Sequence, residues 1–313
     1  SPRGLAPPCP LCQEAGLTRA SHATQPALRL GGSQEMSAAE LGRASLLLMA
    51  DPVVLGWAGG LLGCHIVMQT AATIYPNWLF STKPGVVAHQ LVIAVPFLYA
   101  AIMGTALYLY DADIAKLASG TYADRMYGWS ENGWGLLRFM IGFQIYDLLS
   151  TAMVPSLRGA QHMLHHGATL LTALSGADSQ RPMCLYYCVF FFGIVEISSV
   201  PLVLVDLFRH LPNLTRSRLG GFLNEQSRTL FAVSFLLLRG VAFPAVMLIS
   251  YWPDLLTAYW NNDIRCSWLA YGWGWLSSTL LTCLQLFWTM KIIRVLAKGN
   301  VKGRDANAAQ TEN

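Results

Sequence analysis

Long apolar runs recur along this 313-residue chain, and they limit its fold more than any other feature. A helix needs about 20 mostly apolar residues to cross the hydrocarbon core of a bilayer. The sequence predicts seven such spans, at roughly residues 52–74, 86–110, 134–154, 156–177, 183–208, 229–251 and 267–290. A backbone in lipid must satisfy its own hydrogen bonds, which favours helices. We therefore expect an all-α, polytopic membrane protein with about seven transmembrane helices.

The charge of the chain supports this class of protein. Only 12% of the residues are charged, whereas a soluble domain carries about 25%. The net charge is +4, and the basic residues lie in loops beside the spans rather than along a stripe. Nucleic-acid-binding proteins concentrate such residues on one surface. We expect no nucleic-acid partner.

The two ends of the chain differ from the spans. Residues 1–35 are rich in Pro, Gly, Ser, Ala and Arg, which predicts a disordered or leader segment. Residues 299–313 are polar and predict a disordered tail, and 111–133 predict a polar loop. More Lys and Arg residues flank the spans on the C-terminal side than on the other side. By the positive-inside rule this tail is cytoplasmic, and the sequon at Asn213 then stays unglycosylated.

The cysteines do not indicate a metal site. Cys9 and Cys12 have the spacing of half a zinc knuckle, but no second pair lies nearby. A structural zinc ion needs four ligands. We expect no bound metal.

One polar stretch interrupts the apolar sequence, at residues 161–169. It contains His162, His165, His166 and Thr169. On a helix, His162 lies one turn from both later histidines, and Thr169 lies one turn beyond them. Ionisable groups inside a membrane are costly and are usually functional. This stretch is the predicted functional site.

Other ionisable residues fall at a similar depth. At ~1.5 Å per residue, the side chains lie ~10–18 Å from the expected cytoplasmic end of five different spans. They are His65, Asp147, His165, Glu196 and Arg239. An unpaired charge there is disfavoured by at least a few kcal/mol. We expect a polar intramembrane cavity in which Glu196 pairs with Arg239 and Asp147 orients a histidine.

Each candidate also has a structural interpretation. The Glu196–Arg239 pair is better explained as a strut between helices, and His65 and His89 as satisfied cavity or interface histidines. The position of His162 is compatible with a side chain that simply faces the cytoplasmic entrance of the cavity. For His165 and His166 a functional role is favoured, because adjacent residues on a helix point ~100° apart and both imidazoles must be accommodated.

Several motifs together resemble a known family. They are residues 139–147, ending in Tyr146-Asp147, the His165-His166-x-x-Thr169 pattern, the segment 196–202 beginning Glu196-Ile197-Ser198, and Phe287-Trp288-x-x-Lys291. In this order they resemble the TLC (TRAM–Lag1–CLN8) domain, a family that includes the ceramide synthases. The resemblance covers roughly residues 50–295.

The resemblance implies an acyl-transfer site in the endoplasmic reticulum or another endomembrane. Acyl-CoA would be the co-substrate, a membrane lipid amine the acceptor, and no other cofactor is needed. The resemblance implies that His165 and His166 are the nucleophile or general base, with Thr169 as a supporting hydroxyl. Together with the layer of ionisable residues, it predicts the catalytic residues His165, His166 and Asp147 and the substrate-binding residues His162, Thr169, Glu196, Arg239 and Tyr146.

The chain also departs from the synthases. They carry further aspartates on the helix after the histidines, whereas here Glu196 stands alone, with Asp206 near the far end of the span. The chain thus looks closer to TLC proteins outside the synthase branch. Two hypotheses stay open: an acyl-CoA-dependent N-acyltransferase, and a non-catalytic lipid-binding or lipid-sensing regulator of membrane composition.

A third hypothesis is a membrane di-iron hydroxylase or desaturase. His162-x-x-His165-His166 has the spacing of one histidine box of those enzymes. They need about eight histidines to hold two irons. The remaining histidines, at positions 22, 65, 89 and 210, are unpaired, which disfavours this reading.

Overall fold

The structure is a computed structural model, and it describes residues 46–75, 81, 83–177 and 182–311, with side chains as far as 298. Contacts divide the chain into units 1–34 and 35–313, and only the second contains described residues. The leader expected at residues 1–35 therefore lies outside the described residues. The second unit contains helices and no strand in its described part, which confirms the all-α prediction.

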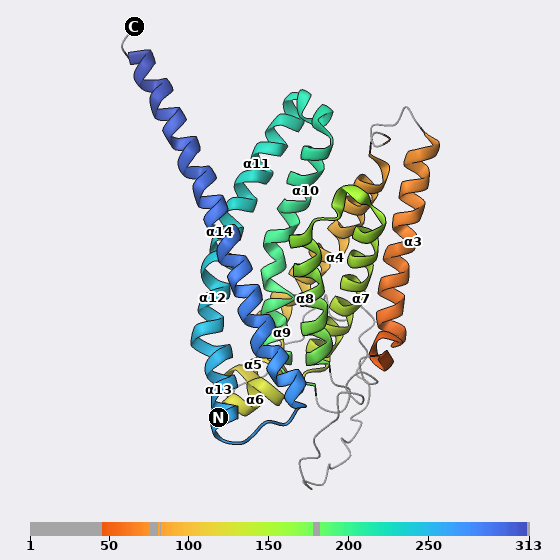
Figure 1. Cartoon of the computed structure of the whole chain (residues 1–313), viewed down its shortest axis with the longest axis vertical. Helices are drawn as coiled ribbons and strands as arrows, with labels where there is room; N and C mark the ends of the chain where they lie inside the picture. The colour runs from red at the N-terminus through yellow and green to blue at the C-terminus, as the bar shows by residue number, and fades with distance from the viewer. Residues whose placement is uncertain (1–45, 76–80, 82, 178–181, 312–313) are drawn as a thin grey trace, which may run out of the picture. The chain divides into compact units, whose positions relative to one another are not determined.

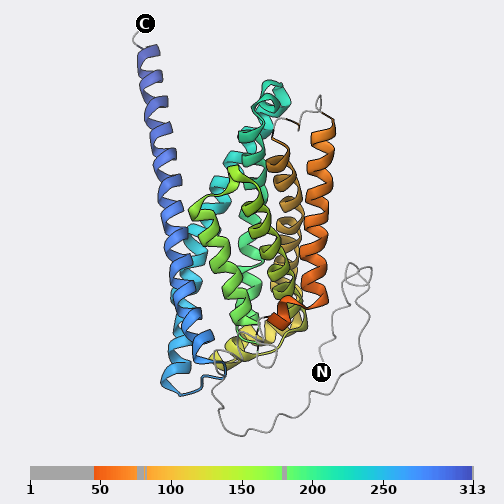
Figure 2. The same cartoon turned by 45° about the vertical axis from the view of Figure 1, so that its right-hand side comes forward.

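The helices run up and down beside one another (Figures 1 and 2). The longer ones are α3 (Pro52–Ile74), α4 (Pro84–Tyr110), α7 (Glu131–Met153), α8 (Ala160–Gly176), α10 (Ser199–His210), α11 (Arg218–Phe235) and α14 (Trp268–Thr311). Five segments are long and apolar enough to cross a membrane: Pro52–Ile74, Pro84–Tyr110, Leu185–His210, Arg218–Trp260 and Trp268–Lys298. The chain is thus a polytopic membrane protein, and crossings by α7 and α8 stay predictions.

Helix α7 lies in the interior of the bundle. It packs against α3, α4, α8 and α9 (Leu185–Phe191), and its large side chains Phe139, Met140 and Phe143 are fully buried. Only helices that face lipid need an apolar outer surface. An enclosed helix can carry polar residues such as Gln144 and Asp147, provided that they face partners or a cavity.

The span predicted at 183–208 is broken in the structure. Helix α9 ends at Phe191, a 3-10 turn follows at Ile194–Ser198, and α10 then begins. Gly193 lies in this break against Gly104 of α4, so close that a Cβ atom on Gly104 would overlap the Gly193 backbone. The break brings the polar segment that starts at Glu196 to the helix interface.

The span predicted at 229–251 belongs to a longer helical segment, Arg218–Trp260. Two π-helical stretches, Leu236–Ala242 and Met247–Tyr251, flank the short helix α12 (Phe243–Val246). Pro244 has no N–H to complete the α-helical pattern, which accounts for irregular turns nearby. Such π-helical turns are frequent at functional sites, and this one carries Arg239.

The polar loop predicted at 111–133 contains two short helices, α5 (Ala112–Ser119) and α6 (Tyr122–Tyr127). Asp111 caps α5 by accepting from the Ile114 amide at 2.9 Å. Thr121 and Asp124 form a reciprocal capping box at α6. These caps explain helices in a stretch without long apolar runs. At the other end of the chain, α14 includes most of the stretch for which the sequence predicts a disordered tail.

Candidate functional site

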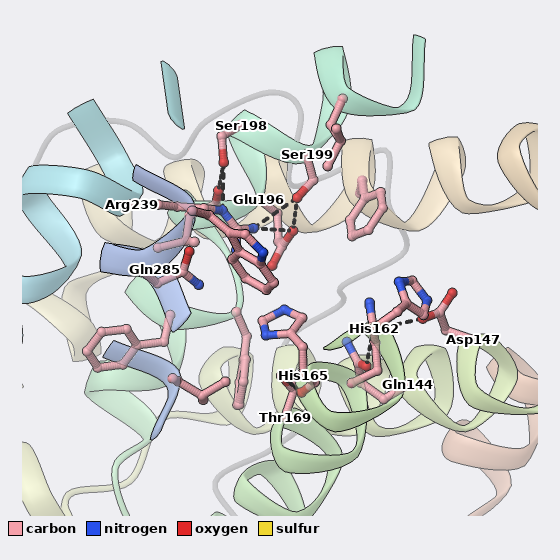
Figure 3. A pocket seen from close by; sticks show the side chains of 18 of the residues that line it. Gln144, Asp147, His162, His165, Thr169, Glu196, Ser198, Ser199, Arg239 and Gln285 are labelled. Carbon is pink, nitrogen blue, oxygen red and sulfur yellow. Dashed lines mark hydrogen bonds and ion pairs between the residues drawn. The ribbon is translucent and has the colours of Figure 1, made fainter. Parts of the chain in front are cut away.

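A cavity of about 720 Å³ lies between α4, α7, α8, the α9–α10 segment, Arg218–Trp260 and α14. Basic residues line one end: Arg209, His210 and Lys291. Apolar and aromatic side chains line the other end, among them Met247 and Tyr251. The predicted polar cavity is therefore present, and its polar groups form two clusters (Figure 3).

The three histidines of α8 face different neighbours. The His162 and His166 rings lie 4.1 Å apart, because residues four apart share one helix face. The His165 ring turns toward α14 and meets Trp288 edge-on at 5.2 Å. The adjacent imidazoles of His165 and His166 meet different neighbours, and their ring centroids lie 5.0 Å apart with the planes nearly perpendicular.

The first cluster surrounds Asp147 of α7, whose side chain is 2% exposed. Its Oδ2 lies 2.7 Å from His166 Nδ1 and 3.5 Å from His162 Nε2. Its Oδ1 lies 3.5 Å from His89 Nε2. The Asp147–histidine pairing expected from the sequence is thus a cluster of three histidines around one carboxylate.

Gln144 completes the environment of His166. Its Oε1 lies 2.9 Å from His166 Nδ1, one turn of α7 before Asp147. Two oxygens therefore meet the same imidazole nitrogen. This arrangement holds the ring of His166 in one orientation where it lines the cavity.

The second cluster is formed by Glu196 and Arg239, which the structure joins in the expected ion pair at 3.1 Å. Two hydroxyl groups complete it. Arg239 donates to Ser198 Oγ at 2.8 Å and to Ser199 Oγ at 2.9 Å, and Ser199 donates to Glu196 at 2.5 Å. The charges are therefore compensated although Arg239 is only 7% exposed.

His165 lies between the two clusters in the close view (Figure 3). Its Nδ1 is buried and has no hydrogen-bond partner within the described part of the chain. Thr169, expected to bind substrate, lines the cavity and donates from its hydroxyl to the His165 backbone carbonyl at 2.8 Å. His162 and His166 each have a hydrogen-bonding side chain at one ring nitrogen, whereas the buried Nδ1 of His165 has none among the described residues.

Two sequence candidates lie away from the cavity lining. Tyr146 is fully buried, and its hydroxyl lies 3.0 Å from His65 Nδ1. His65 Nε2 lies 3.1 Å from Gln69 Oε1 on the same helix, α3. Neither Tyr146 nor His65 is among the residues that line the cavity. Both pack behind the Asp147 cluster.

Sequence reasoning did not foresee the contact of His89 with Asp147 or the place of Gln144 in the site. His89 was interpreted as a satisfied cavity or interface histidine, and it lines the cavity beside Asp147. Its position near the start of a span, at the same end of the bundle as His162, is a signal for its place. Nothing in the sequence around Gln144 distinguishes it from a packing residue.

A third polar group lies outside the cavity lining, next to Tyr187, which does line the cavity. Arg125 of α6 makes a bidentate pair with Asp254 of α13 (Trp252–Trp260) at 2.6 and 2.7 Å. Tyr187 donates to the same carboxylate at 2.5 Å. Hydrogen bonding to Asp254 raises the pKa of the Arg125 guanidinium, so Arg125 stays charged. This group joins three helices and was not predicted.

These features define a helical integral membrane protein with a polar cavity between its helices. The model of the TLC domain matches residues 86–294, which is more than half of the chain. The chain therefore belongs to the TLC-domain family, as its motifs predict. Neither the curated proteins nor the solved structures contain a match to it.

Proposed function

We propose that this protein binds a membrane lipid in the cavity and transfers an acyl chain from acyl-CoA to a lipid amine of the sphingoid type. His165 would be the general base. The observation that carries the proposal is the free Nδ1 of His165, buried beside the Glu196–Arg239 pair. A neutral imidazole in reach of an ammonium group is suited to remove its proton.

The reaction balances without a further reactant. The amine attacks the thioester carbonyl, a C–N bond forms, and the C–S bond breaks to release the thiol of coenzyme A. The ammonium group loses two protons in all: His165 takes the first and releases it to water, and the second, lost as the C–N bond forms, passes through His165 to the leaving thiolate. His166 is held by Asp147 and Gln144, and in this proposal it fixes the orientation of α8 and does not take the proton.

The two ends of the cavity fit the two substrates. Arg209 and Lys291 give the polar end positive charge suited to the phosphates of a CoA ester, with His162 inside this entrance. The aromatic side chains Tyr187, Phe191 and Phe243 offer an apolar chamber to an acyl chain. We propose that the basic end faces the cytoplasm of an endoplasmic reticulum or other endomembrane, where acyl-CoA is available.

A direct assay tests this proposal. Purified protein in lipid nanodiscs receives a labelled fatty acyl-CoA and a sphingoid amine, and the labelled amide is quantified. His165→Ala should lower turnover by about 10²-fold or more while the thermal midpoint stays near that of wild type. The matched control is His65→Gln, a buried histidine outside the cavity, which should retain turnover.

The second candidate function is a non-catalytic lipid binder or sensor. The specific observation in its favour is that Glu196, Arg239 and Ser199 already satisfy one another, which suits a site that holds a polar head group. Mass spectrometry of the lipids that copurify with wild type and His165→Ala separates the two functions. A binder shows no amide product from wild type and a gradual loss of one lipid class in the variant.

A further inference from the structure

The geometry points to a metal site beside the proposed base: we infer that His89, Asp147 and His162 bind one divalent transition-metal ion. Each residue offers one ligand atom, and the three atoms all lie within 4.8 Å of one another. They come from three helices, α4, α7 and α8. The inference does not depend on acyl transfer.

The distances in this cluster suit a shared ion better than hydrogen bonds. His89 Nε2 lies 3.5 Å from Asp147 Oδ1, and His162 Nε2 lies 3.5 Å from Asp147 Oδ2, whereas N–H···O bonds lie at about 2.7–3.2 Å. Ligands about 2.0–2.1 Å from a tetrahedral metal lie roughly 3.3–3.4 Å from one another. The two contacts are close to that spacing.

The hydrogen bonds of His89 leave its other nitrogen free for a metal. Ser150 Oγ donates its single hydrogen to the Asp147 backbone carbonyl at 3.0 Å. The contact of 3.0 Å between His89 Nδ1 and Ser150 Oγ is therefore donated by His89. A neutral His89 then directs the lone pair of Nε2 at the Asp147 carboxylate, an arrangement that a cation between them relieves. Metal-ligating histidines donate their second N–H in this way.

The carboxylate of Asp147 calls for positive charge nearby. It is 1% exposed, and every ion-pair partner recorded for it in the described chain is a histidine, with no Lys or Arg among them. Its closest contact is with His166, whose Nδ1 lies 2.7 Å from Asp147 Oδ2 and is shared with Gln144 Oε1 at 2.9 Å. A buried carboxylate with no permanent positive charge beside it is costly, and a bound cation removes that cost.

The donor set defines the class of metal. Two imidazole nitrogens and one carboxylate oxygen suit Zn²⁺ or Fe²⁺, and three protein ligands leave positions open for water or substrate. His162 Nε2 also lies 3.1 Å from Thr151 Oγ1, and this hydroxyl must turn its hydrogen away when the metal binds. Counting cysteine pairs and histidine boxes could not find this site, because its ligands lie far apart in the sequence.

Metal binding to the full chain in nanodiscs tests the inference. The protein is treated with a chelator, then Zn²⁺ or Fe²⁺ (without oxygen) is added in separate arms, and bound metal is measured by elemental analysis after desalting. Wild type should bind about one ion per chain in at least one arm. Its thermal midpoint should rise by roughly 5–10 °C at about a hundredfold excess over the dissociation constant.

Variants locate the ion. Asp147→Asn and His89→Gln should lose both the bound metal and the rise in midpoint, whereas the control His65→Gln should retain both. His162→Gln is the mildest change, because 37% of that side chain is exposed. It replaces the other two variants in this test if they do not fold. With Co²⁺ as probe, wild type should show visible absorption bands that His162→Gln removes.

Two outcomes overturn the inference. One is wild type that binds less than about 0.1 ion per chain in both arms with no change in midpoint. The other is wild-type stoichiometry in His162→Gln and Asp147→Asn. Acyl transfer is tested separately, because His165→Ala should lower turnover by about 10²-fold or more and keep the metal.

Discussion

Arg239 reaches from a π-helical turn to Glu196 in the break between α9 and α10, with 3.1 Å between its guanidinium nitrogen and the carboxylate oxygen. Both residues thus lie at helix irregularities. Regular helices at these two places would point the side chains elsewhere around each axis. The ion pair therefore ties two irregular segments together across the cavity.

Breaking this pair should destabilise the protein. Arg239→Leu leaves Glu196 as a buried charge without its partner, which costs about 3–5 kcal/mol of unfolding free energy. The double variant Arg239→Leu/Glu196→Leu removes both charges and should recover part of this loss. Denaturation in the same nanodisc lipid measures both. Equal losses in the single and double variants would show that packing, and not charge, is the cause.

The contact between Gly104 and Gly193 should tolerate no added atom. Gly104→Ala places a methyl group against the Gly193 backbone and should cost about 1–3 kcal/mol. Gly60→Ala is the matched control, since a Cβ there meets nothing within 4 Å. A higher helix propensity makes the control neutral or slightly stabilising, by up to about 1 kcal/mol. Thermal midpoints of the two variants should therefore move in opposite directions, or only the first should move.

The Arg125–Asp254 pair should contribute more than a neighbouring surface pair. Arg125→Gln leaves Asp254 unpaired at 4% exposure and should cost about 2–3 kcal/mol. Arg265→Gln breaks the more exposed pair with Asp263 and should change the free energy of unfolding by less than about 1 kcal/mol. Similar losses in both variants, measured by denaturant titration, would contradict this ranking.

Acid should weaken the loop before α14. The Arg265 guanidinium beside Asp263 lowers the pKa of that carboxyl below its usual 3.8, and Tyr122 adds a hydrogen bond. A carboxyl with a lowered pKa in the folded state stabilises it above the unfolded pKa, and this contribution is lost as the pH falls through the folded value. The free energy of unfolding of wild type and of Asp263→Asn is measured by denaturant titration between pH 6 and 3. Wild type should be the more stable of the two, and this difference should shrink only below about pH 4. An advantage that is constant over this range would contradict the assignment.

The proposed orientation has its own test. Asn213 is exposed in the 3-10 turn Pro212–Arg216, at the end of the bundle that we propose to be cytoplasmic. The sequon should therefore remain unmodified when the chain is made in a eukaryotic cell. A shift in electrophoretic mobility that disappears in Asn213→Gln, and with glycosidase, would invert the orientation.

The sequence determined the class of fold and the family. Its apolar runs are long, and a bilayer accepts few backbone structures, so the helices at Pro52–Ile74 and Pro84–Tyr110 were predictable nearly to the residue. The ion pair of Glu196 with Arg239 was predictable as well, because an unpaired charge at that depth is costly. The spacing of His162, His165 and His166 placed their rings on known sides of a helix.

Only the tertiary structure decided which side chains meet. Asp147 was expected beside a histidine, but its contact with His89 depends on the packing of α4 against α7, which no local spacing encodes. Tyr146, next to Asp147 in the sequence, points away from the cavity toward His65 because neighbouring helix residues lie ~100° apart. The break at Gly193 needed the close approach of Gly104 from another helix. Local pattern fixes helices, whereas the members of a site depend on how those helices pack.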